Sequence, residues 1–98
     1  MVLLTIICET SFDETIHGLL DKVGAPGFTR FSGVTGSGET GRREGTIVWP
    51  GRNTIFLAAM EEALADQFVA GLGDAIEVAS RVRKPAVRVF SENVVVRI

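Results

Sequence analysis

The sequence predicts an α+β fold in which two helices cover one face of an antiparallel sheet. Three observations support this: apolar runs with the length of strands, two stretches with the apolar period of a helix, and a glycine-rich segment that divides the chain into halves. The elements follow the order βαββαβ, with a long loop between the second and third strands and a short C-terminal strand. This is the ferredoxin-like arrangement. A chain of 98 residues accommodates a single domain of this kind, over residues 1–98.

The first half of the chain is predicted to form a strand, a helix and a second strand. Residues 2–8 are a continuous apolar run, typical of a strand buried on both faces. Ser11 and Glu14 have the spacing of a capping box, which predicts a helix over residues 11–23. Apolar side chains recur along it at the i, i+3, i+4 and i+7 positions, and a glycine and a proline follow it. Residues 28–34 alternate imperfectly and are predicted to form the second strand.

The third strand and the second helix follow the glycine-rich segment. Residues 53–60 are apolar and again have the length of a buried strand. From Glu61 the apolar side chains recur every three or four residues, which predicts a helix that Pro85 ends. Gly71 and Gly73 lie inside this helix, so it is either interrupted there or packed closely against a neighbouring backbone.

The end of the chain is predicted to form the last core strand over residues 86–90, then a turn and, over residues 94–98, a short strand or a tail. The strands at 2–8 and 53–60 are apolar on both sides, whereas the helices of this fold cover only one side of the sheet. With 46% apolar residues and a mean hydropathy of +0.29, the chain is more apolar than a small monomer requires. We therefore expect copies of the chain to cover the open face in a closed ring.

Composition limits the functions that the chain can have. A net charge of −2 provides no global basic field, so we expect no nucleic-acid partner. No apolar run approaches the ~18 residues of a membrane span and no secretory signal is recognisable, so we expect a cytoplasmic protein that does not insert into membranes. Cys8 is predicted to be a buried side chain rather than a reactive thiol.

One histidine, His17, and one cysteine cannot build a metal site within one chain, so we expect no metal. No catalytic triad can be drawn, so we expect no enzymatic activity.

Residues 33–53 form the candidate binding loop. The first thirteen contain five glycines and one large apolar residue, so the segment cannot order itself in isolation. Gly36-Ser-Gly-Glu-Thr-Gly41 matches the dinucleotide pattern, but a strand rather than a helix follows, and two arginines stand where a P-loop requires lysine and serine or threonine. Glycine amides and the guanidinium groups of Arg42, Arg43 and Arg52 suit a phosphate or a carboxylate. Alternatively, these arginines only keep the loop solvated and pair with its acids.

Five short stretches of the sequence form a recognisable set. They are Gly27-Phe-Thr, Val34-Thr-Gly-Ser-Gly38, Trp49-Pro-Gly-x-Asn53, Val87-Arg-Val-Phe90 and Val94-Val-Val-Arg-Ile98. In these motifs, and in layout over the whole chain, the sequence resembles the PII signalling superfamily, specifically its PII-like branch. The resemblance implies a cytoplasmic homotrimer that binds an adenine nucleotide (AMP, ADP or ATP) as effector in the clefts between subunits. It also implies that the long loop, the T-loop, docks on a protein target such as a transporter or an enzyme.

The sequence departs from the nitrogen-regulatory PII proteins in three places. Those proteins carry a Thr-Gly-x-x-Gly-Asp-Gly-Lys phosphate loop before the last core strand, where this chain has the shorter Arg81-Val-Arg-Lys-Pro85, so specificity for ATP does not carry over. Residues 33–53 contain neither the glutamine nor the lysine with which those proteins hold 2-oxoglutarate. The chain has no tyrosine, which excludes their uridylylation.

The resemblance and the side-chain chemistry together nominate the site residues. The predicted nucleotide-binding residues are Gly36, Gly38, Arg42, Arg83, Lys84, Arg88 and Arg97. The predicted partner-binding residues of the T-loop are Glu39, Thr40, Arg43 and Trp49. Arg83 and Lys84 have an alternative role as cations at the negative end of the second helix. A metal-responsive trimer of the CutA type and a ligand-free adaptor remain alternative functions.

Overall fold

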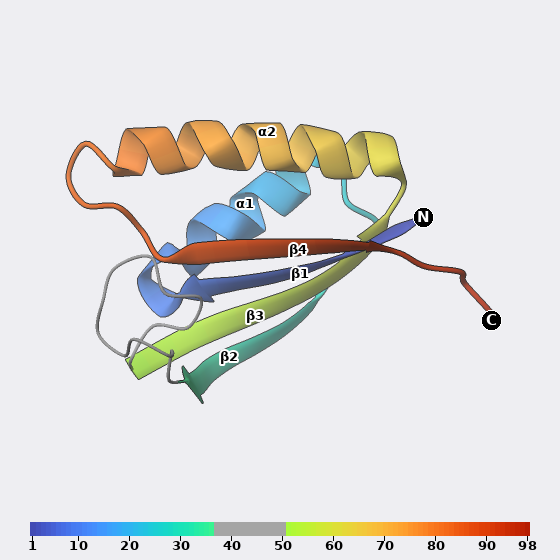
Figure 1. Ribbon diagram of the computed structural model, residues 1–98, viewed down its shortest axis with the longest axis horizontal. Coiled ribbons are helices and arrows are strands. Elements are labelled where there is room, and N and C mark those ends of the chain that lie inside the picture. The colour runs from blue at the N-terminus through green and yellow to red at the C-terminus, as the bar shows by residue number, and fades with distance from the viewer. Residues whose placement is uncertain (37–50) are drawn as a thin grey trace.

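The computed structural model describes residues 1–36 and 51–98, and its elements follow the predicted order (Figure 1). They are β1 (Val2–Glu9), the 3-10 turn η1 (Thr10–Phe12), α1 (Asp13–Val23), β2 (Thr29–Gly36), β3 (Gly51–Met60), α2 (Glu62–Ala79) and β4 (Val87–Asn93). The strands form one sheet in the order β2-β3-β1-β4, and neighbouring strands are antiparallel. The predicted α+β, ferredoxin-like fold is confirmed. The sequence over residues 46–49 also has the character of a strand extension, but this prediction falls outside the described residues.

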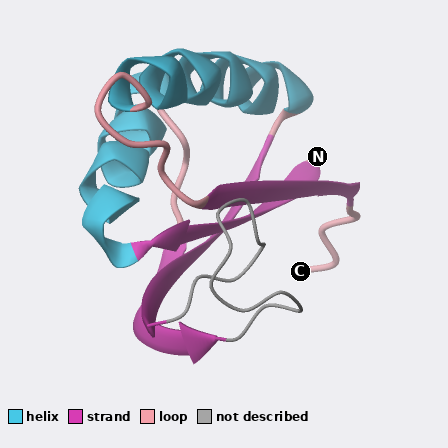
Figure 2. Cartoon of the chain, turned by 60° about the vertical axis from the view of Figure 1, so that its left-hand side comes forward, coloured by secondary structure: helices cyan, strands magenta, loops and turns pink. Residues whose placement is uncertain are grey.

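Both helices lie on the same face of the sheet (Figures 1 and 2). Every second side chain of β1 points toward them and is buried, as the period of a strand requires. The most deeply buried apolar residues, each at most 1% exposed, are Leu4, Ile6, Cys8, Ile16, Leu20, Phe56, Ala58, Met60 and Phe68. They form the core between sheet and helices, where burial of one large apolar side chain contributes ~1.5–3 kcal/mol.

The start of α1 differs from the prediction. The Ser11 hydroxyl donates to Glu9 Oε1 at 2.9 Å, and Ser11 itself lies in the 3-10 turn that precedes the helix. Phe12 occupies the capping position and provides no capping side chain. Glu14 accepts a hydrogen bond from Arg30 at 3.2 Å. The predicted capping box is therefore wrong, because partners elsewhere in the chain take both side chains.

The second helix runs without interruption through Gly71 and Gly73. A Cβ at Gly71 would lie 3.4 Å from Cδ2 of Leu19, so the two helices approach closely at this glycine. Close packing is thus the correct alternative, although the neighbour is a side chain rather than a backbone. The helix ends well before Pro85, which is buried in the α2–β4 loop, residues 80–86. The prediction that Pro85 ends the helix is wrong, because the chain needs this loop to bring β4 beside β1.

The last strand is longer than predicted. It continues through Asn93, which is opposite Val2. The predicted turn after residue 90 is therefore wrong, and residues 94–98 form the tail rather than the alternative short strand. β1 begins at Val2, so after the hydrogen bond from the Val94 N–H to the Met1 carbonyl (3.1 Å) the tail pairs with no further strand of the described residues. The tail then leads away from the sheet (Figure 1).

A bulge interrupts β2 next to the T-loop. Phe31 is opposite Ile55 and Val34 is opposite Asn53, so β2 has one residue more than β3 between these pairs. Gly33 has a φ of 67°, which a glycine adopts without steric cost. The bulge therefore keeps the alternation of side chains in β2 matched to that of β3 on both sides of the irregularity.

Candidate functional site

The segments that contain the predicted site residues lie at one end of the sheet. Gly36 is opposite Gly51, so both ends of the T-loop segment leave the sheet there. Glu9, the last residue of β1, is opposite Asn53 of β3. The Glu9 N–H donates to the Ala86 carbonyl at 2.9 Å, just before β4 begins. The ends of the T-loop segment, the end of β1 and the α2–β4 loop therefore share one end of the sheet.

Glu9 is a buried carboxylate that fastens the α2–β4 loop to β1. Its side chain is 8% exposed; Oε2 accepts the Ala86 N–H and Oε1 accepts the Ser11 hydroxyl, both at 2.9 Å. The Arg83 guanidinium also donates to Oε1. Burial raises the pKa of this carboxyl, but the hydrogen bonds from Arg83, Ala86 and Ser11 outweigh burial and hold the pKa below its usual value. Glu9 is therefore ionised at neutral pH.

A second buried carboxylate, Asp13, fixes the start of α1. Its Oδ2 accepts the Thr54 hydroxyl at 2.9 Å and lies 2.8 Å from NH2 of Arg30. The Arg30 guanidinium also contacts Glu14 at 3.2 Å and lies 5.4 Å from the centre of the Phe56 ring. Because these contacts join α1, β2 and β3, we assign Asp13 and Arg30 a structural role.

The structure brings some of the predicted nucleotide-binding residues together. Arg83 and Lys84 are exposed in the α2–β4 loop, and Arg88 follows near the start of β4, at the end of the sheet where Gly36 closes β2. Since β2 and β4 are opposite edges of the sheet, Gly36 and Arg88 lie about three strand spacings apart across it, ~14 Å. Arg88 is level with Ile55 of β3 and Gly36 with Gly51, which adds ~13 Å along the strands and makes the separation ~20 Å. Arg97 lies beyond the other end of β4, so one chain does not bring it to the rest. The other predicted residues lie outside the described part of the chain: Gly38, Glu39, Thr40, Arg42, Arg43 and Trp49.

Sequence reasoning missed the buried polar groups at this end. Among the described residues, the buried polar ones are Glu9, Asp13, Asn53 and Thr54. A partial signal was present, because Glu9 directly follows an apolar strand and so had to lie next to the core. Its partner Arg83 is 74 positions away, and no local pattern reveals such a pair.

The lone cysteine and histidine take structural positions. Cys8 is 1% exposed, and burial, followed by the charges of Asp13 and Glu9, raises the pKa of its thiol from 9.0 to about 12. The thiol stays protonated at neutral pH, as expected of a buried side chain. The His17 ring packs edge-on against the Phe28 ring, with 5.0 Å between the ring centres.

Within residues 1–36 and 51–98, no three potential metal ligands lie together, and no helix is long and apolar enough to span a membrane.

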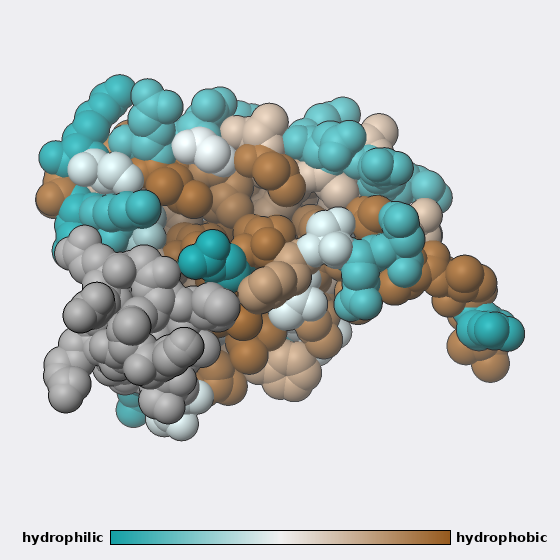
Figure 3. Space-filling model, in the orientation of Figure 1, coloured by the Kyte–Doolittle hydropathy of each residue, from teal (hydrophilic) through white to brown (hydrophobic). Residues whose placement is uncertain are grey.

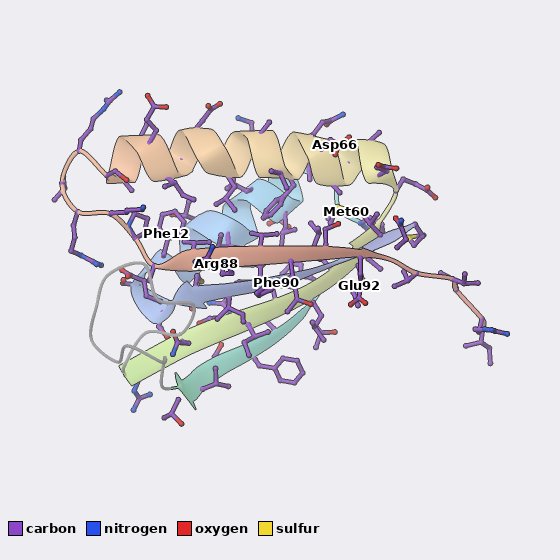
Figure 4. All side chains as sticks on the ribbon, in the orientation of Figure 1. Phe12, Met60, Asp66, Arg88, Phe90 and Glu92 are labelled. Carbon is purple, nitrogen blue, oxygen red and sulfur yellow. The ribbon has the colours of Figure 1, made fainter. Side chains whose placement is uncertain are left out.

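The face of the sheet opposite the helices carries apolar side chains without cover from the described residues. Arg88, Phe90 and Glu92 recur at every second position of β4 and so share this face (Figure 4). Phe31 on β2 and Phe90 are each 47% exposed. The half-buried residues between them on β1 and β3 are Leu3, Thr5, Ile7, Ile55 and Leu57. Apolar residues are also visible in the middle of the space-filling view, below the polar residues that line α2 (Figure 3).

An antiparallel β2-β3-β1-β4 sheet with both helices on one face, and a long connection between β2 and β3, is the architecture of PII-like signalling proteins. The chain belongs to the nitrogen regulatory protein P-II family, whose family model matches residues 1–97. No curated protein matches the chain.

Several solved structures are similar to the chain. CPII from Thiomonas intermedia K12, bound to ADP, AMP and acetate, has a TM-score of 0.64 at 22% identity, over 95% of this chain and 86% of that one. The same protein bound to ADP and bicarbonate has a TM-score of 0.61 at 26% identity, with the same coverage of 95% and 86%. A PII-like signalling protein from Thermus thermophilus has a TM-score of 0.65 at 24% identity, over 95% and 85%. These likenesses support the fold independently of the family match.

Proposed function

We propose that the chain is a PII-like signalling protein that binds an adenine nucleotide, AMP, ADP or ATP, as its effector. It is a cytoplasmic, non-enzymatic regulator formed by a single domain over residues 1–98. The observation that carries this proposal is that the T-loop ends and the basic α2–β4 loop lie at the same end of the sheet in a member of the P-II family. The similar protein CPII, which is bound to ADP and AMP, supports the choice of effector.

The proposed assembly is a homotrimer with the nucleotide in clefts between subunits. The apolar open face supports self-association, because burial of apolar area contributes ~25 cal/mol per Å². Arg97 supports a site shared between chains, since it lies beyond the far end of β4 and reaches the basic loop only from another subunit.

The proposed phosphate contacts come from the basic side chains at the T-loop end. Arg83, Lys84 and Arg88 are exposed there, and the Gly36 backbone allows close approach. Gly38 and Arg42 extend this proposed set into the T-loop. The proposed contacts with a target, a transporter or an enzyme, come from the T-loop residues Glu39, Thr40, Arg43 and Trp49.

Calorimetric titration with AMP, ADP, ATP, cyclic nucleotides and divalent metals tests this function. The parent should bind an adenine nucleotide, and replacing Arg83 and Lys84 together by alanine should lower ADP affinity at least tenfold, since a charge-assisted hydrogen bond contributes ~1.5–3 kcal/mol. Adenosine affinity should change less. The single variant Lys84→Ala is compared with Lys22→Ala, which also removes one exposed lysine, but from α1.

The same titration separates the alternatives. A parent that binds metals and no nucleotide would support the metal-responsive trimer, and a parent that binds neither would support the ligand-free adaptor. A double variant that binds ADP as tightly as the parent would move the phosphate site to Arg42, Arg88 and Arg97.

A further inference from the structure

Arg83, a proposed phosphate ligand, already contacts an anion of its own chain. Its guanidinium donates to the carboxylate of Glu9, 74 positions earlier in the sequence. A phosphate that recruits Arg83 therefore meets a competitor with the same charge and the same hydrogen-bonding chemistry, because carboxylate and phosphate both accept from the guanidinium fork.

The two partners differ in their freedom to move. The Glu9 side chain is 8% exposed and is also held by the Ala86 N–H and the Ser11 hydroxyl, whereas the Arg83 side chain is 50% exposed. The Glu9 N–H independently holds the Ala86 carbonyl at 2.9 Å. Arg83 can therefore leave the carboxylate while the loop stays attached to β1 through Ala86.

The Asp13–Arg30 pair shows what a purely structural pair looks like in the same molecule. Arg30 is 26% exposed, contacts both Asp13 and Glu14, and lies over the Phe56 ring. Its guanidinium contacts side chains of α1 and β3, and it lies on β2, the edge of the sheet opposite β4. The Glu9–Arg83 pair differs because its cation is half exposed and belongs to that loop.

We propose that Glu9 is a specificity-determining residue of the nucleotide site, acting as an internal anion that competes with the ligand's phosphates for Arg83. This inference rests on the proposed nucleotide binding. Ligands whose phosphates reach Arg83 must displace Glu9, whereas adenosine binds without this cost. Glu9 thereby sets how strongly the site prefers a phosphorylated nucleoside to the nucleoside itself.

Glu9→Gln tests the competition. The glutamine amide oxygen can still accept the Ala86 N–H, but the side chain no longer carries the charge that holds Arg83. ADP affinity should rise roughly fivefold, as expected for loss of a half-exposed ion pair, and adenosine affinity should stay unchanged. Glu14→Gln is the matched control: it removes the same charge from a carboxylate that contacts Arg30, and should leave both affinities unchanged.

A double-mutant cycle assigns the effect to Arg83. In an Arg83→Gln background, Glu9→Gln should no longer raise ADP affinity, because the contested cation is gone. A folded Glu9→Gln variant whose ADP affinity is unchanged or lower than the parent's would overturn the inference and leave nucleotide binding intact. A parent that binds no adenine nucleotide would overturn both.

A crystal structure of the parent with ADP provides a test without any variant, should Glu9→Gln fail to fold. The Arg83 guanidinium should contact a phosphate and lie beyond hydrogen-bond distance from Glu9. An Arg83 that still donates to Glu9 in the complex would show that the pair is structural and that Glu9 does not compete with the ligand.

Discussion

The two faces of the sheet are built from the same strands, yet the chain closes only one of them. On the helix side, Ile6 and Phe56 are fully buried. On the opposite side, the neighbouring residues Ile7 and Leu57 are only half-buried, and Phe90 is 47% exposed. An apolar run in the sequence therefore does not show that one chain buries both sides of a strand. The second side indicates a surface that another molecule covers.

The open face is covered from within the chain at one end. Glu9 shares the alternation of Leu3 and Ile7, but it is buried because the α2–β4 loop closes over it through Arg83 and Ala86. The open face thus has an apolar middle and a polar end. This difference supports separate roles: association of subunits at the middle, and ligand binding at the polar end beside the T-loop.

The largest expected effect comes from the covered face. Phe56→Ala should lower the free energy of unfolding by ~3–5 kcal/mol, because it leaves a cavity between the sheet and the helices. Phe90→Ala on the other face is the matched comparison: its ring is 47% exposed within one chain, so the fold of the single chain should lose less, and only contacts between subunits would add to the cost. Urea unfolding at a fixed protein concentration measures both; equal losses would mean that the two faces are equally buried.

The next effect concerns assembly through the open face. Leu57→Arg places a charge in the apolar middle and should weaken association by ~2–4 kcal/mol, since an unpaired charge resists burial. Light scattering at micromolar concentration should show about three subunits for the parent and a smaller mass for the variant. Ala63→Arg, on the exposed surface of α2, is the charge control and should keep the parent's mass. A monomeric parent would show that the open face is not a subunit interface.

The covered and open faces also explain which parts of the fold the sequence could predict. Apolar periodicity located β1, β3 and the helices, because it records burial over many residues. Single-residue signals failed where another contact outweighed them. The Ser11 hydroxyl donates to Glu9, two residues earlier, rather than capping a helix, and β4 extends to Asn93 because it pairs with β1 as far as Val2.

The site was predictable in part for the same reason. The position of the basic loop follows from the order of the elements, so Arg83 and Lys84 could be placed between the second helix and the last core strand from the sequence. The carboxylate that contacts Arg83 could not, because a pair formed across 74 positions depends on how the finished fold packs. The binding of nucleotide or of a partner by the T-loop residues stays a prediction.

A smaller effect comes from the polar end at low pH. The pKa of Glu9 lies below its ordinary value of 4.5 in the folded chain, so its ionised form stabilises the fold at neutral pH. This contribution is lost as the pH falls below 4.5 and through the folded-state pKa. Between pH 7 and about pH 3 the parent should lose ~1 kcal/mol more unfolding free energy than Glu9→Gln. Parallel losses in urea unfolding would show that Glu9 contributes no pH-dependent stability.

The smallest effect concerns the bulge that keeps the faces of β2 in register. Gly33 has a φ of 67°, and an added Cβ would lie 3.6 Å from NH1 of Arg52, an ordinary contact. The cost of Gly33→Ala is therefore backbone strain alone, about 1 kcal/mol of unfolding free energy. Gly73→Ala is the opposite control: its Cβ would meet nothing within 4 Å inside α2, so it should stabilise the chain by up to ~1 kcal/mol. If both substitutions stabilise the chain equally, the bulge does not require the left-handed conformation at Gly33.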